Sequence, residues 1–139
     1  MIREFQQTDM KPVLDIWLEA SVLAHDFIKR EYWESKLNDI WDFYLPASET
    51  YVFEEDDAVR GFLSLFENTV AALFVSPAFQ GKGIGIQLIN KAKALRETLE
   101  LSVYKKNGKS FEFYQRCGFT AAGERVDERT GEEEILMRW

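Results

Sequence analysis

The first third of the chain repeats its apolar residues at helical spacing. One predicted helix begins near Thr8 and Asp9 and tolerates Pro12 in its first turn. Its buried face consists of Val13, Ile16, Trp17 and Ala20. The period lapses between residues 21 and 26 and resumes in a second predicted helix, which ends before Pro46 because a residue preceding proline disfavours helical backbone. The apolar face of this second helix consists of Trp33, Leu37, Ile40, Trp41 and Tyr44.

The rest of the chain alternates between β-rich runs and shorter helical patterns. Strands are predicted at residues 2–5, 51–53, 59–66, 69–75, 99–104, 119–126 and 134–139. The polar turn EEDD makes a hairpin of the second and third of these strands. Helices are predicted at 84–95 and 110–116, the latter terminated by Gly118. This order predicts a single α/β domain over residues 1–139 with a mixed sheet.

Composition restricts the class of protein. The chain is 46% hydrophobic and 14% aromatic, which is typical of a packed globular protein. No apolar run approaches the roughly 20 residues of a membrane span, and the N-terminus lacks the pattern of a signal peptide. A single cysteine, Cys117, excludes an internal disulfide and a cysteine-based zinc site. We therefore expect a cytoplasmic protein without a metal and without a membrane partner.

Charge is distributed unevenly along the chain. Residues 80–116 hold eight Lys or Arg against three Asp or Glu, a local charge of +5, whereas the remainder holds nine against 21, a local charge of −12. Such a division favours an anionic ligand on one side and a cationic ligand on the other, although two solvated faces would give the same pattern. Nucleic acid is not expected as a partner, because the acidic majority would repel a long polyanion.

The segment SPAFQGKGIG, residues 76–85, places three glycines at alternate positions between a predicted strand and a predicted helix. Free backbone N–H groups and the positive end of a helix dipole can hold phosphate there, and Gly81, Gly83 and Gly85 would let the backbone approach it closely. Gln80 and Lys82 would add a donor and a charge. The segment fits neither a Walker loop nor a dinucleotide fingerprint. A ligand-free turn is the alternative.

Two segments resemble the cofactor motifs of the GCN5-related N-acetyltransferases. LFVSPAFQGKGIGIQLI, residues 73–89, meets the signature Gln/Arg-x-x-Gly-x-Gly/Ala with Gln80, Gly83 and Gly85. VYKKNGKSFEFYQRCGF, residues 103–119, is similar to the second segment, where asparagine precedes a short helix carrying Phe-Tyr and then Gly-Phe. The resemblance implies an α/β (α+β) fold with a mixed, mostly antiparallel central sheet of about six to seven strands flanked by about four helices.

The same resemblance implies acetyl-CoA as the acetyl donor and assigns residues to hold it. The backbone of residues 80–85 would bind the pyrophosphate, the end of strand 69–75 would pair with the pantetheine arm, and Asn107 would bond to that arm. The expected cofactor-binding residues are Leu73, Phe74, Val75, Gln80, Gly81, Lys82, Gly83, Ile84, Gly85 and Asn107. A backbone N–H near Phe74 or Val75 would stabilise the developing oxyanion.

Tyr114 matches the family's general-acid tyrosine, and its phenol is protonated at neutral pH. The alternative is a core aromatic residue on a short helix. The base is open at this point. His25 has a suitable ordinary pKa and lies between the first two helices, Glu67 precedes the strand 69–75, and bulk water needs no dedicated residue.

The acceptor is expected to be a primary amine. The opening MIRE, the HDFI of residues 25–28 and the FYQ of residues 113–115 resemble a bacterial single-domain subgroup that includes protein-lysine acetyltransferases. A protein lysine is therefore the leading acceptor, and Glu19, Asp26, Glu31 and Glu34 would attract its charge. A small amine such as a polyamine or an aminoglycoside, a coenzyme A sensor without turnover and a pure scaffold are the alternatives. Monomer and homodimer both remain open.

Overall fold

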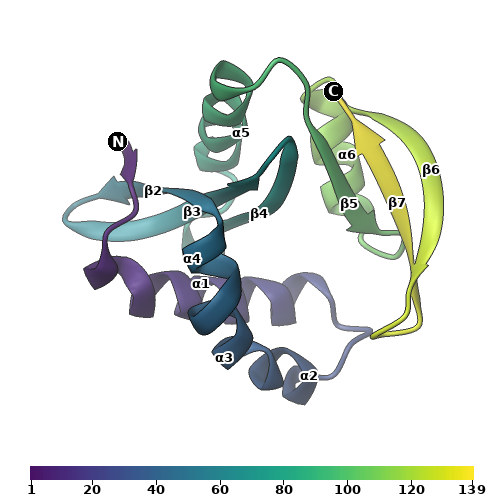
Figure 1. Cartoon of the computed structure of the whole chain (residues 1–139), viewed down its shortest axis with the longest axis horizontal. Coiled ribbons are helices and arrows are strands. Elements are labelled where there is room, and N and C mark those ends of the chain that lie inside the picture. Colours follow the sequence, from purple (N-terminus) through teal and green to yellow (C-terminus); the bar gives the residue numbers. More distant parts are fainter.

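The computed structural model describes residues 1–139 and contains one seven-stranded sheet (Figure 1). The strands are β1 (Ile2–Glu4), β2 (Glu49–Glu55), β3 (Ala58–Phe66), β4 (Thr69–Val75), β5 (Glu100–Tyr104), β6 (Thr120–Asp127) and β7 (Glu132–Arg138). The helices are α1 (Met10–Ala24), α2 (Arg30–Ser35), α3 (Leu37–Asp39), α4 (Leu45–Ala47), α5 (Ile84–Leu95) and α6 (Gly108–Arg116). None of them is long and apolar enough to cross a membrane.

The sheet order is β1-β2-β3-β4-β5-β7-β6, and every neighbouring pair is antiparallel except β4 and β5. These two parallel strands share one paired position, Thr69 with Glu100, at the start of each strand. Beyond it they run apart, as Figure 1 shows. A bulge at Ala71 adds to the bend, because Ser64 pairs with Ala72 while the next residue of β3, Leu65, pairs with Val70. The edge of β4 that faces β5 is therefore open along most of its length.

Alternation along the strands produces a hydrophobic core on each face of the sheet. On one face, Val52 and Phe62 pack with α1 and with Ile40 and Leu45. On the other face, neighbouring residues of the same strands, including Phe53 and Leu63, pack with α5 and α6. Side chains of successive strand residues point to opposite faces of the sheet. Both faces are therefore apolar, and helices pack on each of them. The predicted fold class is confirmed.

The second predicted helix is wrong in its continuity. The structure divides this stretch into α2, α3, a π-helix at Ile40–Tyr44 and α4. Pro46 lies inside α4 rather than beyond the helix, because a proline in the first turn of a helix does not need the N–H that it lacks. The wider π turn also rotates Trp41 and Tyr44 outward, and they are 46% and 56% exposed. Only Trp33 and Ile40 of the predicted apolar face are buried.

Candidate active site

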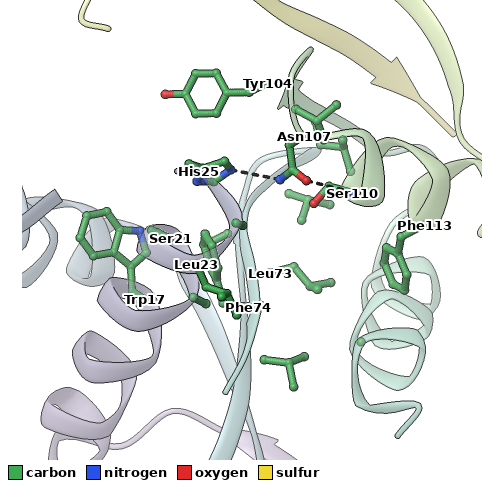
Figure 2. Close-up of a pocket in the computed structure, with 18 of the residues that line it drawn as sticks. Trp17, Ser21, Leu23, His25, Leu73, Phe74, Tyr104, Asn107, Ser110 and Phe113 are labelled. Carbon is green, nitrogen blue, oxygen red and sulfur yellow. Dashed lines mark hydrogen bonds between the residues drawn. The ribbon is translucent and has the colours of Figure 1, made fainter. Parts of the chain in front are cut away.

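A cleft of about 1040 Å³ opens where β4 and β5 diverge. Its lining includes the end of α1, most of β4, the glycine segment, β5 and α6, together with residues of the α2–α4 stretch and of the β6–β7 end. Figure 2 shows Leu73 of β4 between Phe74 of the same strand and Phe113 of α6, with His25 of the α1 end above Phe74. The topology thus brings into one site segments that are far apart in the sequence.

The glycine segment forms the turn between β4 and α5. Gly81 and Gly83 have φ angles of +75° and +84°, a left-handed conformation that favours glycine. A Cβ atom added at either residue would meet nothing within 4 Å, so the space above this backbone is open. Helix α5 starts directly afterwards at Ile84, and the first N–H groups of a helix have no partner within it. The turn therefore presents backbone donors to the cleft, as an anion site requires.

Gly85 and Ile84 differ from the other residues of this segment. A Cβ at Gly85 would lie 3.2 Å from the Phe113 ring, so this glycine lets α5 and α6 approach each other. Gly85 also borders the cleft, so its contact with an anion stays a prediction. Ile84 is only 4% exposed and belongs to the core, although it also borders the cleft. Only its backbone N–H remains a candidate donor.

Gln80 and Lys82 are engaged with the protein itself. The Nε2 atom of Gln80 donates to the carbonyl oxygen of Val75 at 3.2 Å, which ties the turn to the end of β4. The ammonium group of Lys82 lies 5.2 Å from the centroid of the Phe79 ring, a cation–π contact. Gln80 lines the cleft, whereas Lys82 lies outside its lining. The predicted donor of Gln80 and the predicted charge of Lys82 thus lie near the turn, but both contact other parts of the protein.

Several basic side chains line the cleft from α6 and from the residues before it. From this part of the chain they are Lys106, Lys109 and, at the end of α6, Arg116, while Lys36 and Arg129 line other parts of the cleft. Lys106 pairs with Glu132 at 3.2 Å, while no ion pair is formed by Lys109 or Arg116. All three belong to the locally positive segment of residues 80–116. An anion held by the glycine turn would therefore find cationic partners on the facing helix.

The predicted residues of β4 lie at the open edge of the sheet. Leu73, Phe74 and Val75 line the cleft, and their antiparallel partner β3 covers only one edge of the strand. The Phe74 ring stacks on Phe62 at 5.8 Å on the α1 face. Because β5 pairs with β4 only at Thr69, the backbone of Leu73 and the N–H of Val75 are available to an extended ligand. The Val75 carbonyl accepts from Gln80, and the backbone groups of Phe74 face β3, so Phe74 is not the predicted oxyanion donor.

Tyr114 lies on α6 and lines the cleft, as predicted for its position, yet it is also part of the core. Its ring packs edge-on against Phe113 at 5.1 Å and Phe119 at 5.6 Å. Burial raises the pKa of Tyr114 above its usual range. The phenol is therefore fully protonated at neutral pH and held in one orientation by its aromatic neighbours.

His25 and Asn107 meet in the cleft. The Nδ2 atom of Asn107 lies 3.1 Å from Nε2 of His25, and the Oδ1 atom of Asn107 accepts from the backbone N–H of Ser110 at 3.2 Å. Asn107 thus caps α6 and bridges to α1 at once, so both ends of its amide are occupied. Burial lowers the pKa of His25 to about 4, which leaves the ring neutral and a weak base at neutral pH. The weak basicity of His25 argues against its predicted role as a base, and the contact of Asn107 with the pantetheine arm stays a prediction.

Glu67 lies in the turn between β3 and β4, with a φ of +54°. Strand β4 runs from this turn toward the glycine segment, so Glu67 is at the opposite end of the strand from the cleft opening. It lies outside the lining of the main cleft, and its carbonyl accepts from Arg96 Nε at 2.8 Å. The prediction of Glu67 as a base is wrong, because the sequence position before β4 does not indicate which end of that strand faces the site.

A hydrogen-bonded pair that sequence reasoning missed lines the same cleft. The Tyr104 hydroxyl donates to Asp127 Oδ2 at 2.7 Å, and both residues border the cleft. Burial opposes ionisation of Asp127, but the bonds from Tyr104 and from the Arg129 backbone N–H hold its pKa below the usual range. The two residues are 23 positions apart, and only the pairing of β5 and β6 with β7 brings them together. No local motif could have found this pair.

The four acidic residues predicted to attract a cation are only partly available. Arg30 pairs with Glu19 at 3.2 Å and with Glu34 at 3.4 Å. Asp26 and Glu31 form no ion pair, and Asp26 lines the cleft. Attraction of a cationic acceptor at this end of the site therefore rests mainly on Asp26 and Glu31.

An open edge on β4, a glycine turn at the start of a helix and a buried tyrosine in one cleft define a site for an extended anionic cosubstrate, as in acyl-CoA transferases. Residues 46–121, more than half of the chain, match the model of the acetyltransferase (GNAT) domain. The chain belongs to the GNAT acetyltransferase family. Enzymes of this family transfer an acetyl group to an amine.

Relatives of known name support this placement. The chain is 35% identical over 140 residues to the peptidyl-lysine N-acetyltransferase YiaC of Escherichia coli (strain K12), covering all of this chain and 96% of that protein. Its structure is similar to the apo form of E. coli YjaB, with a TM-score of 0.88 and 26% identity over 100% of this chain and 96% of that one. The PaiA N-acetyltransferase of Thermoplasma acidophilum, solved with coenzyme A, shares the fold at 19% identity, with a TM-score of 0.82 over 99% of this chain and 96% of that one.

Proposed function

We propose that the protein transfers the acetyl group of acetyl-CoA directly to the side-chain amine of a lysine in another polypeptide. The observation that carries the proposal is the cleft itself, where the open edge of β4 meets the glycine turn and Tyr114. The name of YiaC, a peptidyl-lysine N-acetyltransferase, supports lysine as the acceptor. The coenzyme A in the PaiA structure supports the donor.

The residues of the cleft fit acetyl-CoA. In this proposal the backbone of residues 80–84 holds the pyrophosphate, because Gly81 and Gly83 leave open space above donors at a helix start. Lys109 and Arg116 add positive charge from α6. The backbone of residues 73–75 pairs with the pantetheine arm as an added strand, since β5 leaves this edge open.

Acetyl-CoA supplies an activated acetyl group in the form of a thioester. In this proposal the N–H of Val75, which faces the open edge of β4, stabilises negative charge on the carbonyl oxygen, because the backbone groups of Phe74 face β3. The nitrogen of the amine forms the new bond to the acetyl carbon as the carbon–sulfur bond breaks. Tyr114 donates its proton to the departing sulfur and regains one from solvent, and the proton of the amine leaves to water. No dedicated base is assigned, since His25 is a weak base and Glu67 is distant.

Exposed aromatic residues beside the cleft suit a polypeptide acceptor better than a small amine. Trp41, Phe43 and Tyr44 of the π-helix are 46%, 67% and 56% exposed, and Tyr44 also lines the cleft. Large exposed apolar side chains beside a site commonly mark a contact with another protein. The carboxylates of Asp26 and Glu31 would attract the lysine that this protein presents.

The proposed catalytic unit is a single domain comprising residues 1–139. The family model matches the middle of the chain, residues 46–121, but the site needs more than that part. His25 at the end of α1 and Asp127 at the end of β6 both line the cleft, and they lie on either side of the matched segment. Elements from the whole chain therefore complete one sheet and one site.

The experiment that tests this function measures release of free thiol when the purified protein is mixed with acetyl-CoA and an acceptor. A lysine-bearing polypeptide, the same polypeptide with arginine at each lysine, and spermidine serve as acceptors. We expect thiol release and a mass gain of one acetyl group per modified lysine with the first acceptor only. Release with spermidine alone would indicate a small-amine acetyltransferase, and acetyl-CoA binding without any release would indicate a sensor; either result contradicts the proposal.

A further inference from the structure

His25 and Asn107 join the two halves of the molecule across the cleft. His25 is the C-terminal cap of α1, which packs on one face of the sheet, and Asn107 is the N-terminal cap of α6, which packs on the other. Their side chains meet at 3.1 Å although they are 82 positions apart. Figure 2 shows the bond as part of a short chain that runs from His25 through Asn107 to Ser110.

The cap of α6 determines which way the Asn107 amide points. The Ser110 N–H can donate only to an oxygen, so the Oδ1 atom faces the helix and the Nδ2 atom faces His25. The Nδ2 group is a donor, and Nε2 of His25 must accept from it. His25 is consequently neutral, with its proton on Nδ1. In this tautomer only Nε2 has a lone pair that can accept a proton, and that lone pair already accepts from Asn107. The ring therefore cannot also remove a proton from an amine.

Aromatic side chains fix the orientation of the His25 ring. Its centroid lies 5.3 Å from Trp33, 5.1 Å from Tyr104 and 5.7 Å from Phe27. Both His25 and Asn107 are only 9% exposed. The Nδ1 atom has no partner with ordinary hydrogen-bond geometry, and the Ser21 backbone is the only group that offsets the effect of burial on the ring. Loss of the histidine would leave the Asn107 Nδ2 group without its protein acceptor.

We propose that His25 is a positioning residue that acts through Asn107 on α6 and so places Tyr114 against the open edge of β4. The bond fixes the Asn107 amide, the amide caps α6 at Ser110, and Tyr114 lies on the same nine-residue helix. Loss of the acceptor on His25 frees the amide to rotate and weakens the first turn of the helix. The inference rests on the proposed function only where it concerns the effect of His25 on the rate of acetyl transfer. The geometry can be tested separately.

Two amide substitutions at one position provide the test. In His25→Gln the side-chain amide reaches as far from Cα as Nε2 does, so its oxygen can accept from Asn107. In His25→Asn the amide reaches only as far as Nδ1 and cannot. We expect His25→Gln to retain most of the wild-type kcat, and His25→Asn to lose about 10- to 100-fold in kcat, since small displacements of reacting groups have effects of this size. Both should bind acetyl-CoA with similar affinity.

Hydrogen exchange of the Ser110 amide gives a readout that needs no turnover. It should be protected in wild type and in His25→Gln and should exchange faster in His25→Asn. The ¹⁵N spectrum of His25 should show a neutral ring with the proton on Nδ1, and Asn107→Asp, which keeps the cap but removes the donor, should raise the pKa of His25. Comparison of the melting temperatures of the two His25 variants controls for folding.

Equal loss of rate in both His25 variants would overturn the inference and indicate that the imidazole acts as a base. Equal retention of rate and of Ser110 protection would overturn it as well, because the bond would then be dispensable. If the wild-type protein transfers no acetyl group, the proposed function fails, while the exchange and ¹⁵N measurements still decide whether His25 orders α6.

Discussion

At the scale of single residues, burial determines what each polar side chain in the cleft can do. Tyr114 is buried by Phe113 and Phe119, which keeps its phenol protonated. His25 is buried too, but burial has the opposite consequence for a base because it leaves the ring neutral and difficult to protonate. The same physical effect therefore supports Tyr114 as a proton donor and argues against His25 as a proton acceptor.

Substitution of Tyr114 by Phe should separate chemistry from binding. We expect kcat to fall by about 10²- to 10⁴-fold, the usual contribution of a general acid, while the Kd for acetyl-CoA stays close to that of wild type. Steady-state kinetics and calorimetry measure the two quantities. Tyr51→Phe is the matched control, since Tyr51 is equally buried but bonds to Glu49 outside the cleft. An unchanged kcat in Tyr114→Phe would show that another group protonates the sulfur.

His25 should make folding stability depend on pH. Burial lowers its pKa from 6.5 to about 4, so in the interval between these values the unfolded chain binds more protons than the folded protein. Stability is therefore present above pH 6.5 and is lost as the pH falls toward 4. The loss would reach about 3 kcal/mol if the full shift applied. Urea unfolding of wild type and His25→Gln at several pH values measures it, and parallel curves for the two proteins would contradict this origin.

At the scale of elements, the π-helix and the glycine turn show how local sequence and tertiary packing share the determination of structure. The glycine turn, α5 and the Asp56-Asp57 hairpin were predictable, because positive φ angles and apolar periods are local signals. The break between α2 and α4 was not, since Trp41 and Tyr44 fit an apolar face by spacing. Packing of Ile40 and Leu45 against the sheet determines which of these residues are buried.

The exposed aromatic residues of the π-helix should contribute to binding of a polypeptide acceptor but not to binding of a small amine. We expect the double variant Trp41→Ala/Phe43→Ala to lower kcat/KM for the lysine polypeptide by roughly 10-fold, as for the loss of aromatic anchors at an interface. Its rate with a short amine at saturating concentration should be unchanged. Phe66→Ala is the control, because Phe66 is 51% exposed at the far end of β3. Equal effects on both acceptors would mean that the π-helix acts on the fold or the cleft.

At the scale of the whole molecule, the function depends on two parallel strands that pair once and then separate. The sequence predicted the strands β4 and β5 and the turn after β4, but it could not predict that their pairing stops at Thr69 and Glu100. It also could not predict contacts across the cleft such as His25 with Asn107 or Tyr104 with Asp127. These contacts depend on sheet order and twist, which are properties of all strands together. Residues with a local motif were therefore found, while their partners were not.

The central claim is that the glycine turn at the mouth of this cleft binds acetyl-CoA. Calorimetric titration of wild type, Gly83→Glu and Gly131→Glu tests it most directly. Gly83 and Gly131 both have positive φ angles and open space at Cβ, so the two substitutions impose similar backbone strain, but Gly131 lies in the β6–β7 turn outside the cleft lining. The account predicts that wild type and Gly131→Glu bind acetyl-CoA and that Gly83→Glu does not, through charge repulsion and steric block. Equal binding by all three folded proteins would contradict it.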